Sequence, residues 1–140
     1  MTSESERRPI VDPDMGLVLG CRLGGPLESV IAEWPGGELE RTAIGCVTYS
    51  LTQRLGVCSA PVCVRYQFVD DRLVAVELAP ALGAPGGIER NLHRQLAEEI
   101  EAALAVQPGL QDEGYVEYAR GELSVTIDTL DAVIRFEEAL

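Results

Sequence analysis

The segment 62–78 constrains the fold of this chain more than any other stretch. Side chains on a β-strand point alternately to its two faces, so apolar residues two apart share one face. In this segment the apolar residues fall on one face of each half: Val62, Val64, Tyr66, Phe68, Val74, Val76 and Leu78. Asp70 and Asp71 separate the halves, and aspartate tolerates turn geometry. We therefore predict a β-hairpin with its turn at Asp70-Asp71.

Two amphipathic stretches predict helices. In residues 88–106 the apolar side chains recur every four positions, at Ile88, Leu92, Leu96, Ile100 and Leu104. This pattern is typical of a core helix lying across a sheet, which we favour over a helix that binds a partner. In residues 26–34, Pro26 suits the first helical position, and Trp34 ends a shorter apolar stripe. We interpret Trp34 as a core residue rather than an interface anchor.

Further alternation predicts more strands. Residues 46–51 form one strand, and residues 115–119 and 123–127 form two more around a turn at Arg120-Gly121. Residues 38–43 fit a short strand or a loop. Residues 131–138 fit a strand or a short helix, and their β-branched content favours the strand.

These elements predict an α+β fold. The hairpin connections are too short for parallel crossovers, so the strands should be antiparallel. We expect a single sheet of about five to seven strands, with the long helix 88–106 packed on one face and the short helix 26–34 before the sheet. Residues 1–14 are polar and contain two prolines, so they predict a flexible N-terminal arm. Residues 15–140 should then form a single domain.

Charge narrows the classes of partner. The 140 residues include 23 acidic and 11 basic side chains, a formal net charge of −12. Such a chain disfavours nucleic acid and anionic membrane as partners, whereas a basic protein surface is compatible with it. Solubility alone also accounts for the acidity. No apolar run could span a membrane and no signal-peptide pattern is present, so we expect a cytoplasmic protein. There Cys21, Cys46, Cys58 and Cys63 would be reduced.

The sequence contains no catalytic or metal-binding signature, and we predict no cofactor. The four cysteines lack the paired spacing of a zinc site. Cys58 or Cys63 as a nucleophile would need a base, and His93, the one histidine, is predicted to lie on a helix surface. Asp70 and Asp71 are expected to face water in their turn.

Two motifs carry a resemblance to known proteins. The first is Gly-Cys-Arg-Leu-Gly-Gly-Pro-Leu-Glu-Ser-Val-Ile from Gly20, and the second is the pattern Tyr-x-Phe-x-Asp-Asp-x-Leu-x-x-Val from Tyr66. Together they resemble the small α+β module of the β-lactamase-inhibitor-protein and outer-membrane assembly lipoprotein group, and of small bacterial immunity proteins. The resemblance covers about residues 16–78. It implies a binding scaffold whose sheet face or loops contact another protein.

These observations lead to two hypotheses for function. The first is a non-catalytic protein-binding module, most concretely a cytoplasmic immunity-type inhibitor of a toxin or enzyme with a basic surface. The predicted partner-binding residues lie on the face of the sheet left wet by the long helix: Thr48, Arg65, Gln67, Asp70, Asp71 and Glu77. A homodimer through this face is also compatible. The alternative is a small-ligand-binding domain or modest enzyme with a pocket between helix and sheet, where Tyr49, Arg65 and Gln67 would orient the ligand.

Overall fold

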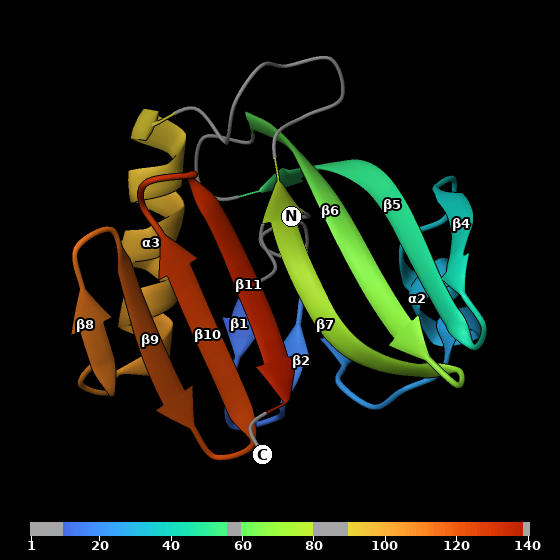
Figure 1. Ribbon diagram of the computed structural model, residues 1–140, viewed down its shortest axis with the longest axis horizontal. Helices are drawn as coiled ribbons and strands as arrows, with labels where there is room; N and C mark the ends of the chain where they lie inside the picture. Colours follow the sequence, from blue (N-terminus) through green and yellow to red (C-terminus); the bar gives the residue numbers. More distant parts are fainter. Residues whose placement is uncertain (1–9, 56–59, 80–89, 139–140) are drawn as a thin grey trace, which may run out of the picture.

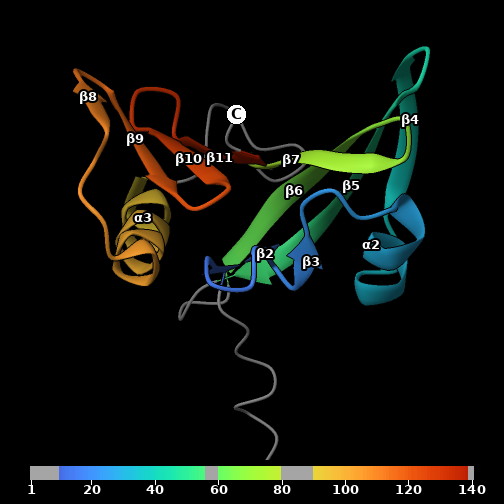
Figure 2. The ribbon, with the colours of Figure 1, turned by 90° about the horizontal axis from the view of Figure 1, so that it is seen from below.

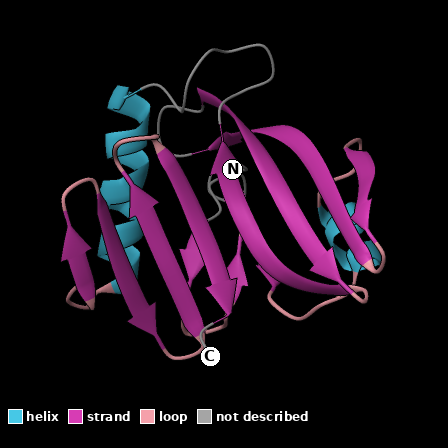
Figure 3. Cartoon of the chain, in the orientation of Figure 1, coloured by secondary structure: helices cyan, strands magenta, loops and turns pink. Residues whose placement is uncertain are grey.

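The structure, a computed structural model, describes residues 10–55, 60–79 and 90–138. Within these residues the chain forms an eight-stranded antiparallel sheet, a three-stranded sheet and two helices (Figure 3). The large sheet has the order β4-β5-β6-β7-β11-β10-β9-β8. Its strands are β4 (Glu38–Ala43), β5 (Cys46–Leu55), β6 (Ala60–Val69), β7 (Arg72–Ala79), β8 (Leu110–Asp112), β9 (Tyr115–Arg120), β10 (Leu123–Asp128) and β11 (Val133–Glu138).

The remaining elements lie on one side of the large sheet. They are the small sheet of β1 (Val11–Asp12), β2 (Leu17–Val18) and β3 (Cys21–Arg22), and the helices α2 (Leu27–Glu33) and α3 (Arg90–Leu104). Figure 2 shows α3 under the β9–β10 part, the small sheet under the middle, and α2 near β4. We call the side that these elements cover the covered face, and the opposite side, which faces the viewer in Figure 1, the open face.

The core lies between the covered face and these elements. Each central strand contributes alternate buried side chains, as the period of two requires. They include Val64, Tyr66 and Phe68 from β6, Val76 and Leu78 from β7, Val125 and Ile127 from β10, and Ile134 and Phe136 from β11. The helix α3 adds Leu92, Leu96, Ile100 and Leu104, and the small sheet adds Val11, Val18 and Cys21.

The central hairpin forms where the alternation places it. β6 and β7 pair antiparallel, with Val64 opposite Leu78 and Tyr66 opposite Val76. Asp70 and Asp71 form the two-residue turn, with φ of 50° and 62°. A positive φ at both central residues is the geometry of the tight hairpin turns that match the twist of a sheet. The predicted turn at Asp70-Asp71 is therefore confirmed.

The predicted fold class is wrong. An α+β fold with a single sheet of five to seven strands under one long helix is not what the chain forms, because the described residues are mostly β and make two sheets. The helix α3 lies within the predicted range 88–106 but covers only one end of the large sheet (Figure 2). The small sheet was missed because its strands have two residues each, too few for alternation to be recognised.

The other predicted segments differ less from the helices and strands of the structure. The short helix occupies 27–33 of the predicted 26–34. Alternatives stood open for 38–43 and 131–138. The first segment is a strand, and in the second the strand occupies 133–138. Within the predicted arm 1–14, Ile10 and Val11 are buried and β1 pairs with β2. Residues 1–9 lie outside the described residues.

We expect Leu96→Asp to lower the free energy of unfolding by about 3 kcal/mol or more, because it would bury a charge without a partner. Leu96 is 1% exposed and packs in the core cluster. Chemical denaturation followed by circular dichroism measures the change. Ala102→Asp, at an exposed position of the same helix, is the control and should cost far less. An unchanged transition for Leu96→Asp would mean that α3 is not part of the core.

Candidate functional site

The predicted partner-binding residues of the hairpin do share one face. Arg65 and Gln67 alternate with the buried residues of β6, and register places Glu77 opposite Arg65 and Thr48 opposite Gln67. All four therefore belong to the open face. The sequence could place them there because alternation is a local property of each strand. Their role in binding stays a prediction.

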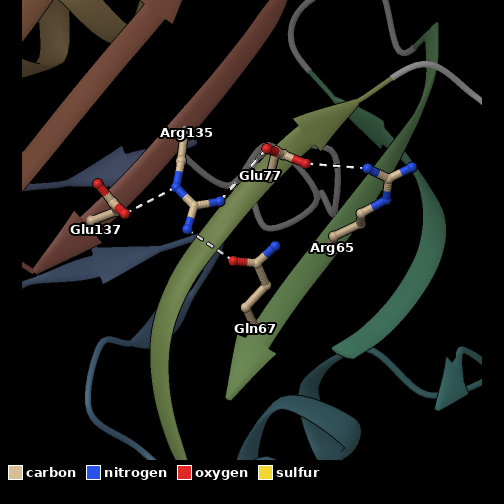
Figure 4. Close-up of polar contacts among 5 residues, drawn as sticks. All are labelled: Arg65, Gln67, Glu77, Arg135 and Glu137. Carbon is tan, nitrogen blue, oxygen red and sulfur yellow. Dashed lines mark hydrogen bonds and ion pairs between the residues drawn. The ribbon is translucent and has the colours of Figure 1, made fainter. Parts of the chain in front are cut away.

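A polar network crosses the middle of the open face (Figure 4). Glu77 accepts from Arg65 Nη1 at 3.2 Å and lies 3.5 Å from Arg135 Nη1. Arg135 also donates from Nε to Glu137 Oε2 and from Nη2 to Gln67 Oε1, each at 2.9 Å. Each guanidinium group is paired with a carboxylate, so the net charge of the four charged side chains is zero. The contacts also restrict the rotamers of these side chains.

Arg135 and Glu137 were missed as site residues. Alternation along 131–138 places them on the face opposite Ile134 and Phe136, but no local pattern shows that β11 lies beside β7. Register pairs Arg135 with Glu77 across that strand boundary. The network therefore depends on a strand pairing between segments more than fifty residues apart in sequence.

Carboxylates outnumber guanidinium groups on the open face. Among the described strand residues, register places these acidic side chains on it: Glu38, Glu40, Glu77, Asp112, Glu117, Asp128 and Glu137. The basic ones are Arg54, Arg65, Arg72 and Arg135, and Arg72 forms an ion pair with Glu138 at 3.6 Å. The net negative charge of the chain is thus partly displayed on this face.

Asp70 and Asp71 lie at the end of this hairpin, and both are exposed. Asp71 is not simply solvated as predicted, because its Oδ1 accepts from the backbone N–H of Leu27 at 3.1 Å. Leu27 is the first residue of α2, whose first N–H groups have no partner within the helix. Asp71 therefore caps α2 from a distant turn, and its charge suits the positive end of the helix dipole.

The three residues expected to orient a ligand in a pocket between helix and sheet do not lie together. Tyr49 is 2% exposed and lies on the covered face, whereas Arg65 and Gln67 lie on the open face. The Tyr49 hydroxyl donates to the Trp34 carbonyl at 2.6 Å and accepts from the Gly37 N–H at 2.8 Å. Tyr49 thus fastens the end of α2 to the sheet and cannot converge with the two open-face residues on one ligand.

Gly37 is required beside this contact. A Cβ atom on Gly37 would come within 2.6 Å of the Tyr49 ring and 2.7 Å of the Ser50 carbonyl. Trp34 is partly buried against the core, and its Nε1 donates to the Leu19 carbonyl at 2.9 Å. Packing, rather than binding, accounts for Trp34 in this structure.

The cysteines that the structure describes do not form a reactive site. Cys21, Cys46 and Cys63 form no disulfide in the structure, while Cys58 lies outside the described residues. Burial raises the pKa of the Cys63 thiol, although the Arg65 guanidinium opposes the rise, so the thiolate nucleophile is disfavoured. No group of three or more His, Cys, Asp or Glu side chains within the described ranges is arranged to bind a metal ion.

His93 was predicted on a helix surface and is instead buried. Its side chain is 5% exposed, and its Nε2 has no hydrogen-bond partner in the structure. Burial lowers the pKa of His93, and the Val133 and Asp128 backbone groups partly oppose this. The prediction failed because position 93 borders the apolar stripe, and the β10–β11 turn packs over it in a way that helical periodicity does not show.

Comparison with known proteins adds little to this geometry. No family model matches the chain, and no curated protein does. Among solved structures it is similar to an extracellular protein containing an SCP domain from Bacillus anthracis str. Ames, with a TM-score of 0.47 and 12% identity. The match covers 83% of this chain and 44% of that chain, so the chain spans less than half of that protein.

These comparisons match no immunity or inhibitor protein. The expected description as an α+β immunity protein is wrong in its fold class, since the described residues are mostly β. Among the helices that the structure describes, none is long and apolar enough to cross a membrane.

We expect the stabilising effect of a neutral His93 to fade on acidification. Because the pKa of His93 is lowered in the folded state, the unfolded chain takes up the proton first as the pH falls through about 6.5. The free energy of unfolding should therefore decrease below that pH, until the folded-state pKa is passed. Urea denaturation of the wild type and His93→Gln at pH 7.5 and pH 5.5 measures it. The stability gap between them should narrow at pH 5.5; a constant gap would contradict the expectation.

Proposed function

We propose that this protein is a non-catalytic binding module whose open face contacts a basic surface on another protein. The observation that carries the proposal is the network of Arg65, Glu77, Arg135 and Glu137, held in place with Gln67 on the open face. Side chains whose rotamers are already restricted lose less entropy when a partner orders them.

The charge of the open face supports a basic partner. Its carboxylate excess, with Asp70 and Asp71 at the hairpin end, complements Lys and Arg side chains and would speed encounter at low salt. The charged and polar side chains of the open face also suit a protein surface better than a small molecule, since small ligands bind in mostly apolar sites. The most concrete activity is inhibition of a toxin or enzyme by covering its basic site.

The proposal keeps the cytoplasm as the location. Cys21, Cys46 and Cys63 form no disulfide in the structure, and thiols stay reduced in that compartment.

The test starts with capture of partners from lysate of the source and by co-expression with the neighbouring reading frame, followed by purification of the captured protein. Surface-plasmon kinetics then compare the wild type with Glu77→Gln. Glu77 bridges both guanidinium groups, so its loss should raise the dissociation rate roughly tenfold, because an interfacial charge would lose its partner. The melting temperature should change little, as these side chains are partly exposed.

Glu98→Gln, an exposed position on α3, is the control for net charge and should leave dissociation unchanged. Two results would overturn the proposal: no saturable binding at either 20 mM or 150 mM salt, about the range where screening changes most, or equal kinetics for the two variants.

A further inference from the structure

Two hairpin turns meet at one corner of the large sheet. The Asp70 N–H at the β6–β7 turn donates to the Gly45 carbonyl at the β4–β5 turn, at 2.8 Å. Figures 1 and 2 both show these turns side by side, next to the start of α2. Between them lies a groove of about 380 Å³, which we call the corner groove, lined by Leu27, Arg41, Val47, Phe68, Asp70 and Asp71.

The corner groove carries opposite charges on its walls. Asp70 and Asp71 supply two carboxylates, and Arg41 supplies one guanidinium group. Across the described ranges, none of these three side chains takes part in an ion pair with another residue. One oxygen of Asp71 is used by the Leu27 N–H, which leaves Asp70 as the more available acceptor. The floor between the walls is apolar.

A large apolar side chain stands exposed beside the groove. Ile44, at the tip of the β4–β5 turn, is fully exposed, in a turn where polar residues are the rule. Val69 is 41% exposed and pairs with Cys46 on the open face. By register Val47 and Phe68, which line the corner groove, belong to the covered face, so the groove lies on the covered side of the sheet edge while Val69 marks the open side. Burying Ile44 against a partner would remove apolar surface from water.

We propose that the corner groove binds an arginine or lysine side chain of the partner protein. Its charged head would meet Asp70 and Asp71, and its aliphatic stem would lie on Leu27 and Val47, as such stems cover apolar surface. An adjacent apolar residue of the partner would pack on Ile44. This inference rests on the proposed function for a basic partner, and it adds a second point of contact at the end of the sheet.

The charges also disfavour the simplest other occupant, a second copy of this chain. A second copy of this chain could offer an arginine, but each copy carries a net charge of −12, and like charges oppose that encounter. Arg41 fixes the orientation of the bound side chain. It repels the basic head group, which therefore lies against Asp70 and Asp71.

The test uses two capped pentapeptides, Gly-Leu-Arg-Leu-Gly and Gly-Leu-Glu-Leu-Gly, titrated into the ¹⁵N-labelled full chain. The arginine peptide should shift the amide resonances of Gly45, Asp70 and Asp71 to saturation, and the glutamate peptide should not. Asp70→Asn and Ile44→Ser should each weaken binding by about two- to fivefold, the range of exposed ion-pair effects. Arg41→Gln should strengthen it by a similar factor.

Matched controls lie in the turn between β10 and β11, at the opposite end of the strands (Figure 1). Leu130 is an exposed apolar residue and Asp131 an exposed acidic one there. Leu130→Ser and Asp131→Asn should leave the affinity unchanged. If Asp131→Asn weakens binding as much as Asp70→Asn does, net charge explains the effect and the groove is not a site.

Three further results would overturn the inference: no shifts at the corner, equal binding of both peptides, or self-association in sedimentation that Ile44→Ser abolishes. The experiments distinguish failure of this inference from failure of the proposed function. A captured partner whose dissociation responds to Glu77→Gln but not to Asp70→Asn or Ile44→Ser would contradict the groove alone. Peptide binding at the corner without any basic protein partner would contradict the proposed function alone.

Discussion

One-sided burial of the large sheet is the constraint on which the rest of the structure depends. Alternate side chains of its central strands pack against α3 and the small sheet, with Tyr66 fully buried near the middle. The Tyr66 hydroxyl accepts from Gln53 Nε2 at 2.6 Å, so its polar atom does not stay unsatisfied inside the core. Because side chains alternate, burying one face of the sheet leaves the other face for polar residues. The polar character of the open face is therefore a consequence of how the core is packed.

The charged residues at the centre of the open face form a connected network. They are not scattered singly but joined across β6, β7 and β11, where Arg135 contacts Glu77, Glu137 and Gln67. Ion pairs this exposed contribute little to folding stability, so their arrangement matters more for how the surface meets another molecule. The network at the centre of the open face is neutral and has a fixed contact geometry. The acidic residues around it would attract a basic surface over a longer range.

Each end of the large sheet holds one helix through side-chain hydrogen bonds. Tyr49 and Asp71 both fasten α2 to the sheet, one at its C-terminal end and one at its first turn. Across the molecule, the Tyr118 hydroxyl donates to Glu101 of α3, and Arg120 donates to the Leu104 carbonyl at the end of that helix. Burial, with Glu101 beside it, raises the pKa of Tyr118 to about 12, so this hydroxyl stays a donor. Both helices are thus held by side chains of strands and turns as well as by their packing in the core.

The features that repeat locally could be predicted from the sequence. They are the hairpin 62–78 with its turn at Asp70-Asp71, the helix around Leu96, and the placement of Arg65, Gln67 and Glu77 on one face. A period of two or of 3.6 is readable from neighbours in the chain. The tertiary structure alone places β11 beside β7, which brings Arg135 to Glu77, and joins two-residue strands into a second sheet. It also decided that His93 is buried and that Tyr49 faces away from Arg65. These features depend on pairing between segments far apart in sequence, and no local period records which segments will meet.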